Sequence, residues 1–330
     1  MQLPHRRTFL QLAIGAAAPL TVSRIARAQT YPMRAITLVV PYPPGGPADL
    51  IGRIMAEGMR ATLGQTVVVE NVTGAGGSVG VGRVARAAAD GYTFVLGAWN
   101  THVANPALYS LPYDVLNDFD PVTLIVTFPF LIVAKKAMPA NDLKGLIAWL
   151  KANPDQASQG SPGLGGPGHV ASILFQNMTG TRYQFVPYRG AAPAMRDLVA
   201  GQIDMMIDNP VTSLPQVRAG RIKAYAVTAK VRLAEAPEIP TVDEAGLPGF
   251  YVSNWIGFWM PKGTPRNIID KLNVAAVTTL ADPAVSRQIV DQSMVIVPRE
   301  QQTPEALSAL QRAEIEKWWP IIRAAGIKGE

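Results

Sequence analysis

Short apolar runs alternate with patterns of helical period along most of this chain, and this alternation restricts its fold more than any other feature. Each run has the length and composition of a buried strand. The predicted strands are residues 35–40, 66–70, 92–97, 130–134, 157–161, 185–187, 205–207, 223–227 and 251–260. Strands that alternate with helices predict an α/β protein with mostly parallel sheets.

Helix signals lie between these strands. Pro47 opens a helical pattern that continues to about residue 63, and proline is favoured in the first turn of a helix. Near the end of the chain, four apolar residues spaced by four form a single stripe, which indicates an amphipathic helix. These residues are Ile268, Leu272, Ala276 and Leu280.

Residues 1–28 have the pattern of an export signal. Arg6 and Arg7 precede an apolar stretch at residues 12–22, and residues 26–28 (Ala-Arg-Ala) match a cleavage pattern. The paired arginines favour the twin-arginine (Tat) route, with the general secretory route as the alternative. The apolar stretch is too short to span a membrane. We therefore predict an exported, periplasmic protein whose mature chain begins near Gln29.

The charge balance argues against several partners. The 330 residues include 30 Lys and Arg against 24 Asp and Glu, a net charge of +6. Four of the basic residues lie in the predicted signal, which contains no acidic residue, so the remainder carries 26 against 24, or +2. The basic residues are scattered, so we expect no nucleic-acid partner. With no cysteine and only three histidines, we also expect no metal and no cofactor.

Two similar turns each follow a predicted strand and precede a predicted helix. Both contain Val-Pro-Tyr, at residues 40–42 and 186–188, and Pro-Ala follows at residues 47–48 and 193–194. Ligands of open α/β sheets bind outside the carboxyl ends of strands, where helix N-termini offer free N–H donors to anions. Two facing turns would hold the two ends of a dicarboxylate. The alternative is chance, or turn chemistry that the two segments share.

A third turn, residues 161–168, is rich in glycine and contains the spacing G-x-G-x-x-G. A dinucleotide site requires an acidic residue about 20 positions further on, where this chain has Tyr188 and Arg189. We therefore interpret the turn as a small-ligand loop or as ordinary loop chemistry.

Trp99, Asn100 and Thr101 follow the predicted strand 92–97 at another carboxyl end. Asn100 and Thr101 can donate hydrogen bonds to a carboxylate, and Trp99 can stack on an aromatic ligand. The alternative is a tryptophan that packs in the core and a helix cap at Thr101.

The remaining polar candidates have two interpretations each. Asp49 and Asp208 either orient loops or bind ligand amines, or they make ordinary turn and cap hydrogen bonds. His102 and His169 are more often structural than catalytic residues in such positions.

Ser78 provides the rival enzymatic hypothesis, an exported α/β hydrolase. Residues 76–80 read Gly-Gly-Ser-Val-Gly and fit the nucleophile-elbow pattern G-x-S-x-G. That elbow requires a strand that runs directly into it, whereas the predicted strand ends near Asn71.

Taken in order, these motifs resemble the Bug family, the substrate-binding proteins of tripartite tricarboxylate transporters. The motifs that carry the resemblance are residues 41–49, 74–77, 100–102 with 105–109, 161–163 with 167–169, and 186–190 with 201–206. The resemblance covers essentially the whole mature chain. It implies a two-lobed periplasmic binding protein of the type II, Venus-flytrap kind, with a central cleft for a small carboxylate, membrane permease subunits as partners and no enzymatic activity. We expect a monomer.

In that fold the chain crosses between the lobes twice, near residues 128–130 and 253–255. One lobe would comprise residues 29–129 and 254–330, and the other residues 130–253. Two departures from the family pattern, Ala48 instead of a hydroxyl residue and Trp99 instead of a small polar one, predict a flatter or more aromatic carboxylate. The candidate ligand-binding residues are Tyr42, Gly45, Gly46, Pro47, Ala48, Asp49, Trp99, Asn100, Thr101, Ser161, Gly163, Gly168, His169, Tyr188, Arg189, Gly190 and Asp208.

Overall fold

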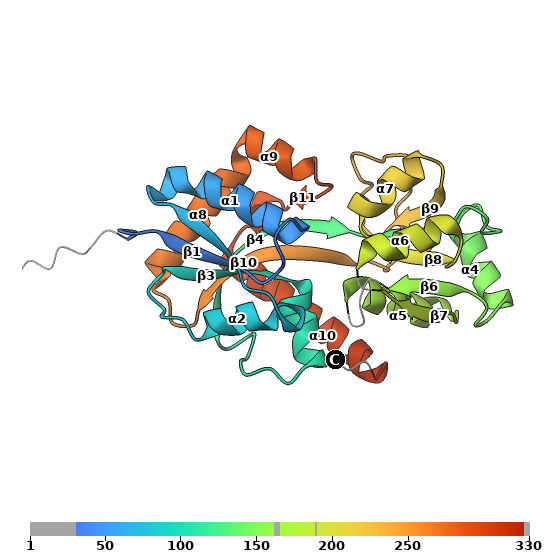
Figure 1. Ribbon diagram of the computed structural model, residues 1–330, viewed down its shortest axis with the longest axis horizontal. Coiled ribbons are helices and arrows are strands. Elements are labelled where there is room, and N and C mark those ends of the chain that lie inside the picture. The colour runs from blue at the N-terminus through green and yellow to red at the C-terminus, as the bar shows by residue number, and fades with distance from the viewer. Residues whose placement is uncertain (1–30, 162–165, 189, 327–330) are drawn as a thin grey trace, which may run out of the picture.

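The computed structural model describes residues 31–161, 166–188 and 190–326, which form two α/β lobes side by side. Figure 1 shows one sheet in each lobe and two long strands that lead from one lobe to the other. The predicted export signal lies outside the described residues. Within the described ranges, no helix is long and apolar enough to cross a membrane, and no group of three acidic or histidine side chains is placed to hold a metal.

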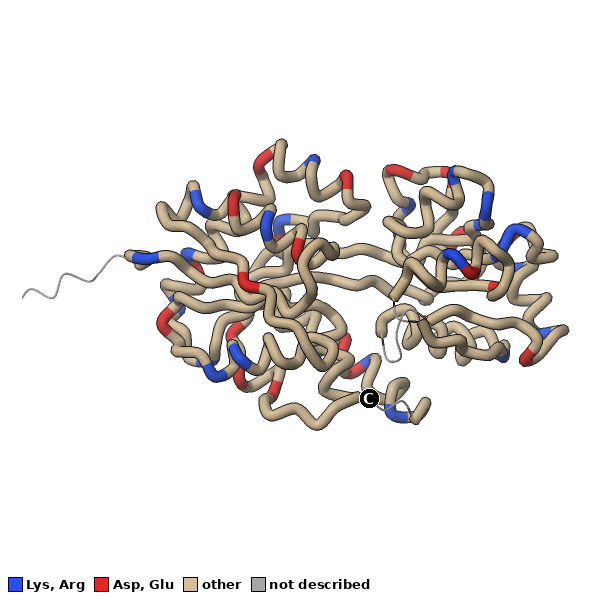
Figure 2. Tube along the Cα trace, in the orientation of Figure 1, with Lys and Arg blue, Asp and Glu red and all other residues tan. Residues whose placement is uncertain are grey.

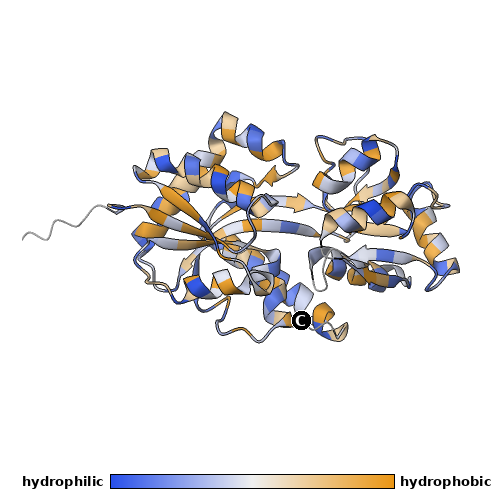
Figure 3. Ribbon diagram, in the orientation of Figure 1, coloured by the Kyte–Doolittle hydropathy of each residue, from blue (hydrophilic) through white to orange (hydrophobic). Residues whose placement is uncertain are grey.

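The first lobe is built on a six-stranded sheet in the order β11-β4-β10-β3-β1-β2. Its strands are β1 (Ile36–Val40), β2 (Val67–Asn71), β3 (Thr93–Ala98), β4 (Phe119–Pro129), β10 (Ser253–Pro261) and β11 (Val295–Ile296). Successive residues of β1 enter different cores, because side chains alternate across a strand. Leu38 belongs to a buried cluster that includes residues of α1 (Pro47–Leu63) and α8 (Arg266–Ala281), whereas the cluster of Val39 includes residues of α2 (Ser78–Ala85) and α10 (Pro304–Ala324). Figure 3 shows strongly hydrophobic strand segments at the centre of this lobe, as expected for the buried residues of β1 and β3.

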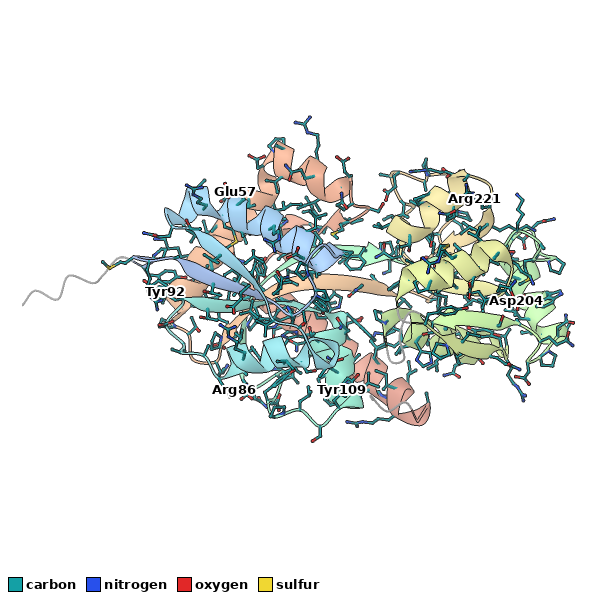
Figure 4. All side chains as sticks on the ribbon, in the orientation of Figure 1. Glu57, Arg86, Tyr92, Tyr109, Asp204 and Arg221 are labelled. Carbon is teal, nitrogen blue, oxygen red and sulfur yellow. The ribbon has the colours of Figure 1, made fainter. Side chains whose placement is uncertain are left out.

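The second lobe is built on a five-stranded sheet in the order β7-β6-β8-β5-β9. Its strands are β5 (Leu131–Lys135), β6 (Ser158–Ser161), β7 (Gln184–Pro187), β8 (Met205–Asp208) and β9 (Ile222–Val227). One face is covered by α4 (Leu143–Ala152) and α5 (Pro167–Thr179), the other by α6 (Ala191–Ala200) and α7 (Pro210–Arg218). Asp204, labelled in Figure 4, ties three strands together: it accepts from the N–H of Ser158 and forms an ion pair with Lys135 at 2.6 Å.

Every strand predicted from the sequence is present, with ends that differ by no more than two residues. The prediction of mostly parallel sheets is wrong, because both sheets are mixed. β1 pairs in parallel with β2 and β3, but β10 runs antiparallel to both β3 and β4. In the second sheet, β5 runs antiparallel to both β8 and β9.

The remaining elements complete the first lobe. They are the 3-10 turn Ala75–Gly77, the π-helical turn Asn100–Ala104, α3 (Asn105–Leu108), α9 (Pro283–Val290) and the 3-10 turn Arg299–Gln301. Basic and acidic residues are interspersed along both lobes (Figure 2).

Candidate functional site

The loop after β1 is held in place by the buried carboxylate of Asp49. This carboxylate accepts hydrogen bonds from the N–H of Gly45 at 2.9 Å, from the amide of Asn71 at 2.9 Å and from Arg53 Nε at 3.0 Å. Burial opposes ionisation of Asp49, but these donors outweigh it and hold its pKa below the usual value. Asp49 therefore orients the loop, one of the two roles predicted for it.

Asn100 joins three first-lobe loops at the carboxyl ends of their strands. Its Oδ1 accepts from the Tyr42 hydroxyl at 2.6 Å, and its Nδ2 donates to the carbonyl of Gly76 at 3.3 Å. The loops approach so closely that a Cβ on Gly77 would lie 2.7 Å from the Thr101 methyl group. Gly45 and Pro47 stay exposed, Gly46 and Ala48 are half-buried, and no side chain caps the N-terminus of α1 among the described residues.

The prediction that Thr101 donates to a ligand is not what the structure shows. Thr101 is fully buried inside the π-helical turn, where its Oγ1 accepts from the N–H of Ala98 at 3.0 Å and lies 3.1 Å from the carbonyl of the same residue. It also lies within the turn and not at its cap.

The stacking role predicted for Trp99 is also wrong. The side chain is 1% exposed, packs edge-on against Trp318 and donates through Nε1 to Glu314 at 2.8 Å. The alternative, a tryptophan that packs in the core, is the correct one. The argument for an aromatic ligand that rested on Trp99 therefore fails.

His102 is structural, as interpreted from the sequence. It is fully buried and stacks on Trp259 with ring centroids 4.0 Å apart. Burial lowers the pKa of His102 to about 3, so the ring is neutral at physiological pH.

In the second lobe, three helices begin at one pocket of about 160 Å³. Gly168 and His169 come from the first turn of α5, Ala191 begins α6, and Asn209 precedes α7. The full lining is Phe130, Gly166, Pro167, Gly168, His169, Ala191, Ile207, Asp208 and Asn209. Among the described residues no side chain caps α5 or α6, and a helix N-terminus is a typical site for an anion.

Two titratable residues predicted for the site line this pocket. Asp208 is buried, and its Oδ2 accepts from the hydroxyls of Thr212 and Ser213, the latter at 2.8 Å. Burial raises the pKa of Asp208, and the hydroxyls partly offset this effect. The His169 ring meets Phe185 edge-on with centroids 4.6 Å apart, and burial lowers the pKa of His169.

Other predicted residues support the pocket without lining it. The Tyr188 hydroxyl donates to Asp197 at 2.7 Å, and the N–H of Tyr188 donates to the carbonyl of Ser161, which is buried. Gly190 precedes α6 with φ +108°, a conformation that favours glycine. Gly163 and Arg189 lie outside the described residues.

Sequence reasoning missed several residues of the pocket and the loops. Asn209 followed by Pro210 is a helix start directly after a strand, and this signal was available. Asn71, at the end of β2, bridges Asp49 and the carbonyl of Tyr42. Phe130 and Ile207 carry no local signal, because only the assembled sheet brings them to the pocket.

The geometry around Ser78 lacks a general base. Ser78 accepts a hydrogen bond from the Asn105 amide at 3.0 Å, and Nδ1 of His102 faces Thr101 instead. Among the described residues, no histidine forms a hydrogen bond to Ser78, as a serine nucleophile of this kind would require.

Comparison with known proteins agrees with the receptor interpretation. Residues 51–327 match the family model described as "Tripartite tricarboxylate transporter family receptor" (TctC). BugT of Bordetella pertussis is 35% identical over 316 residues, which cover 95% of this chain and 94% of BugT. The structure of MatC from Rhodopseudomonas palustris with bound malate is 37% identical, with a TM-score of 0.75, and covers 88% of this chain and 100% of MatC. A second R. palustris structure, with adipate, is 33% identical, with a TM-score of 0.78, and covers 90% and 99%.

Proposed function

Since the chain belongs to the TctC (Bug) family of tripartite tricarboxylate transporter receptors and is a periplasmic solute receptor rather than an enzyme, we propose that its ligand is a small dicarboxylate held between the two lobes. The receptor would deliver this ligand to the membrane subunits of a tripartite tricarboxylate-type transporter. The ligand-bearing relatives, one with malate and one with adipate, support this class of ligand.

The observation that carries the proposal is the pocket where α5, α6 and α7 begin. Each helix N-terminus carries a partial positive charge worth about 0.3–1 kcal/mol to an anion, and up to about 2 kcal/mol when partly buried. One carboxylate of the ligand would bind there, near Gly168 and Ala191. The other would meet the loops of Tyr42, Gly46 and Asn100, with Asp49 as their support.

We propose that the chain divides between the two lobes at the positions predicted from the sequence. One lobe comprises residues 29–129 and 254–330, the other residues 130–253. The proposal is supported by the strand membership of the two sheets, since β4 and β10 belong to the first and β5 and β9 to the second. Ligand binding would close the lobes about the two connections, the usual hinge response. Cleavage near Ala28, export by the Tat route and a monomeric state complete the proposal.

A thermal-shift titration of the mature chain tests the function. A ligand at 100 times its dissociation constant should add about 2.7 kcal/mol to the free energy of unfolding, seen as a higher melting temperature. Dicarboxylates should give this shift, in the wild type and in Ser78→Ala alike. Ester hydrolysis that disappears in Ser78→Ala, together with no shift by any carboxylate, would establish the rival hydrolase.

A further inference from the structure

A partly buried hydrogen-bond cluster links the Asn100 turn to the C-terminal helix. Oε2 of Glu314, on α10, accepts from Nε1 of Trp99 at 2.8 Å and from Nε1 of Trp318 at 2.9 Å. The two indole rings meet edge-on at 5.6 Å, with an interplanar angle of 89°. The cluster therefore joins residues more than 200 positions apart in the sequence.

A carboxylate at this position loses hydration, which disfavours its charged form. Burial raises the pKa of Glu314, although the two indoles and the nearby charge of Lys317 favour its ionised form. A neutral amide would also accept both hydrogen bonds. Hydrogen bonds to an ionised acceptor are about twice as strong as neutral ones, so in its ionised form the carboxylate holds the two indoles more firmly than an amide would.

The same helix holds the Asn100 turn at two further points. Gln311 donates to the carbonyl of His102 at 3.1 Å, and Trp319 Nε1 donates to the carbonyl of Val103 at 2.8 Å. Gln311 and Trp319 thus hold the turn Asn100–Ala104 directly, and Glu314 holds Trp99, the residue before it. A π-helical turn is rare and is frequently found at functional sites.

α10 also contacts the second chain connection between the lobes. Nζ of Lys317 donates to the carbonyl of Tyr251 at 2.8 Å, two residues before β10 begins. Lys317 lies three residues after Glu314, so the helix links the Asn100 turn and this connection through neighbouring side chains. Figure 1 shows α10 below the first sheet, with its C-terminal end near the second lobe.

We propose that Glu314 is a positioning residue for ligand binding: by holding Trp99, it fixes the turn that presents Asn100 to the cleft and ties this turn to α10. The inference rests on the proposed carboxylate-receptor function. Loss of the carboxylate would free Trp99 and, with it, the adjacent Asn100, whose side chain joins the Tyr42 and Gly76 loops.

The test measures the dissociation constants of malate and adipate for the wild type and five variants, together with the melting temperature of each protein without ligand. Glu314→Ala should weaken binding of at least one ligand by about tenfold or more, whereas Glu314→Gln should restore most of the affinity because its amide oxygen accepts from both indoles. Glu316→Ala, an exposed acidic residue on the same helix, is the matched control and should bind like the wild type.

Trp99→Phe keeps an aromatic side chain but removes the N–H donor and part of the buried ring system, so it should weaken binding and also lower the melting temperature. The double variant should bind each ligand no more weakly than Glu314→Ala alone, because both substitutions remove the hydrogen bond between Trp99 and Glu314. Wild-type affinity in both Glu314→Ala and Trp99→Phe, with only the melting temperature lowered, would overturn the inference and leave the receptor function intact. A wild type that binds no carboxylate would overturn both.

Discussion

The hydroxyl of Thr228 joins the two chain segments that pass between the sheets. Its Oγ1 accepts from the N–H of Phe130 at 2.8 Å, between β4 and β5, and also contacts the carbonyl of Val252, just before β10. Thr228 is fully buried, so water cannot replace either bond. The two connections are therefore held together at one point.

Replacement of Thr228 by valine should lower the free energy of unfolding by about 1–3 kcal/mol. The variant keeps the shape of the side chain but leaves the N–H of Phe130 buried without its acceptor. Thr228→Ser keeps the hydroxyl, so its free energy of unfolding should fall clearly less than that of Thr228→Val. Urea unfolding of the three proteins measures the difference, and equal stability of Thr228→Val and Thr228→Ser would contradict the role of the hydroxyl.

The Asp49 carboxylate should make the stability of the protein depend on pH. Its pKa is lowered in the folded state, so its contribution is complete above the unfolded pKa of about 3.9 and is lost as the pH falls through the lower folded value. At pH 7, Asp49→Asn should lower the free energy of unfolding by about 1–3 kcal/mol through the lost charge-assisted bonds.

The stability gap between the wild type and Asp49→Asn should stay constant from pH 7 to about pH 5 and narrow below about pH 4. Asp270→Asn, which breaks an exposed i,i+4 pair with Arg266, should change stability by less than about 0.5 kcal/mol and is the control. A gap of the same size at pH 3 and pH 7 would show that the Asp49 charge is not responsible.

Replacement of Gln159 by an apolar residue should stabilise the protein. It lies fully buried on β6, and neither atom of its side-chain amide has a hydrogen-bond partner among the described residues. An unsatisfied buried polar group costs about 1–3 kcal/mol, so Gln159→Leu should raise the free energy of unfolding by about 1 kcal/mol. Denaturant melts measure this change. A fall in stability instead would indicate an ordered water that satisfies the amide.

Local signals in the sequence predicted most elements, because each strand and helix has a strong pattern of its own. Pro47 at the first position of α1 is an example. β4 was missed: Pro121 and Pro129 interrupt its pattern, and its length is explained only by pairing with β10, far along the chain.

The candidate site was predicted less well than the fold. Asp208 and Gly168, predicted from a strand end and a helix start, both line the pocket of the second lobe. The orientation of Trp99 and Thr101 was not, because it depends on the fit of α10, more than 200 residues later, against their turn. Local sequence cannot tell which side of a turn another element will cover.

Removal of the backbone N–H of Ala191 tests whether the N-terminus of α6 binds an anion. This residue begins α6 and lines the pocket, whereas α5 and α7 already begin with proline. Proline is tolerated at a first helical position but lacks the N–H, so Ala191→Pro should keep the melting temperature of the ligand-free protein. Ala191→Gly keeps the N–H and is the matched control.

Isothermal titration calorimetry of the mature wild type, Ala191→Pro and Ala191→Gly with malate and adipate tests the receptor proposal most directly. We predict saturable one-to-one binding of a dicarboxylate by the wild type and by Ala191→Gly. Binding by Ala191→Pro should be about 10- to 100-fold weaker, the effect of one hydrogen bond to a charged group. No binding heat with any dicarboxylate, or wild-type affinity in Ala191→Pro, would contradict a carboxylate held at these helix N-termini.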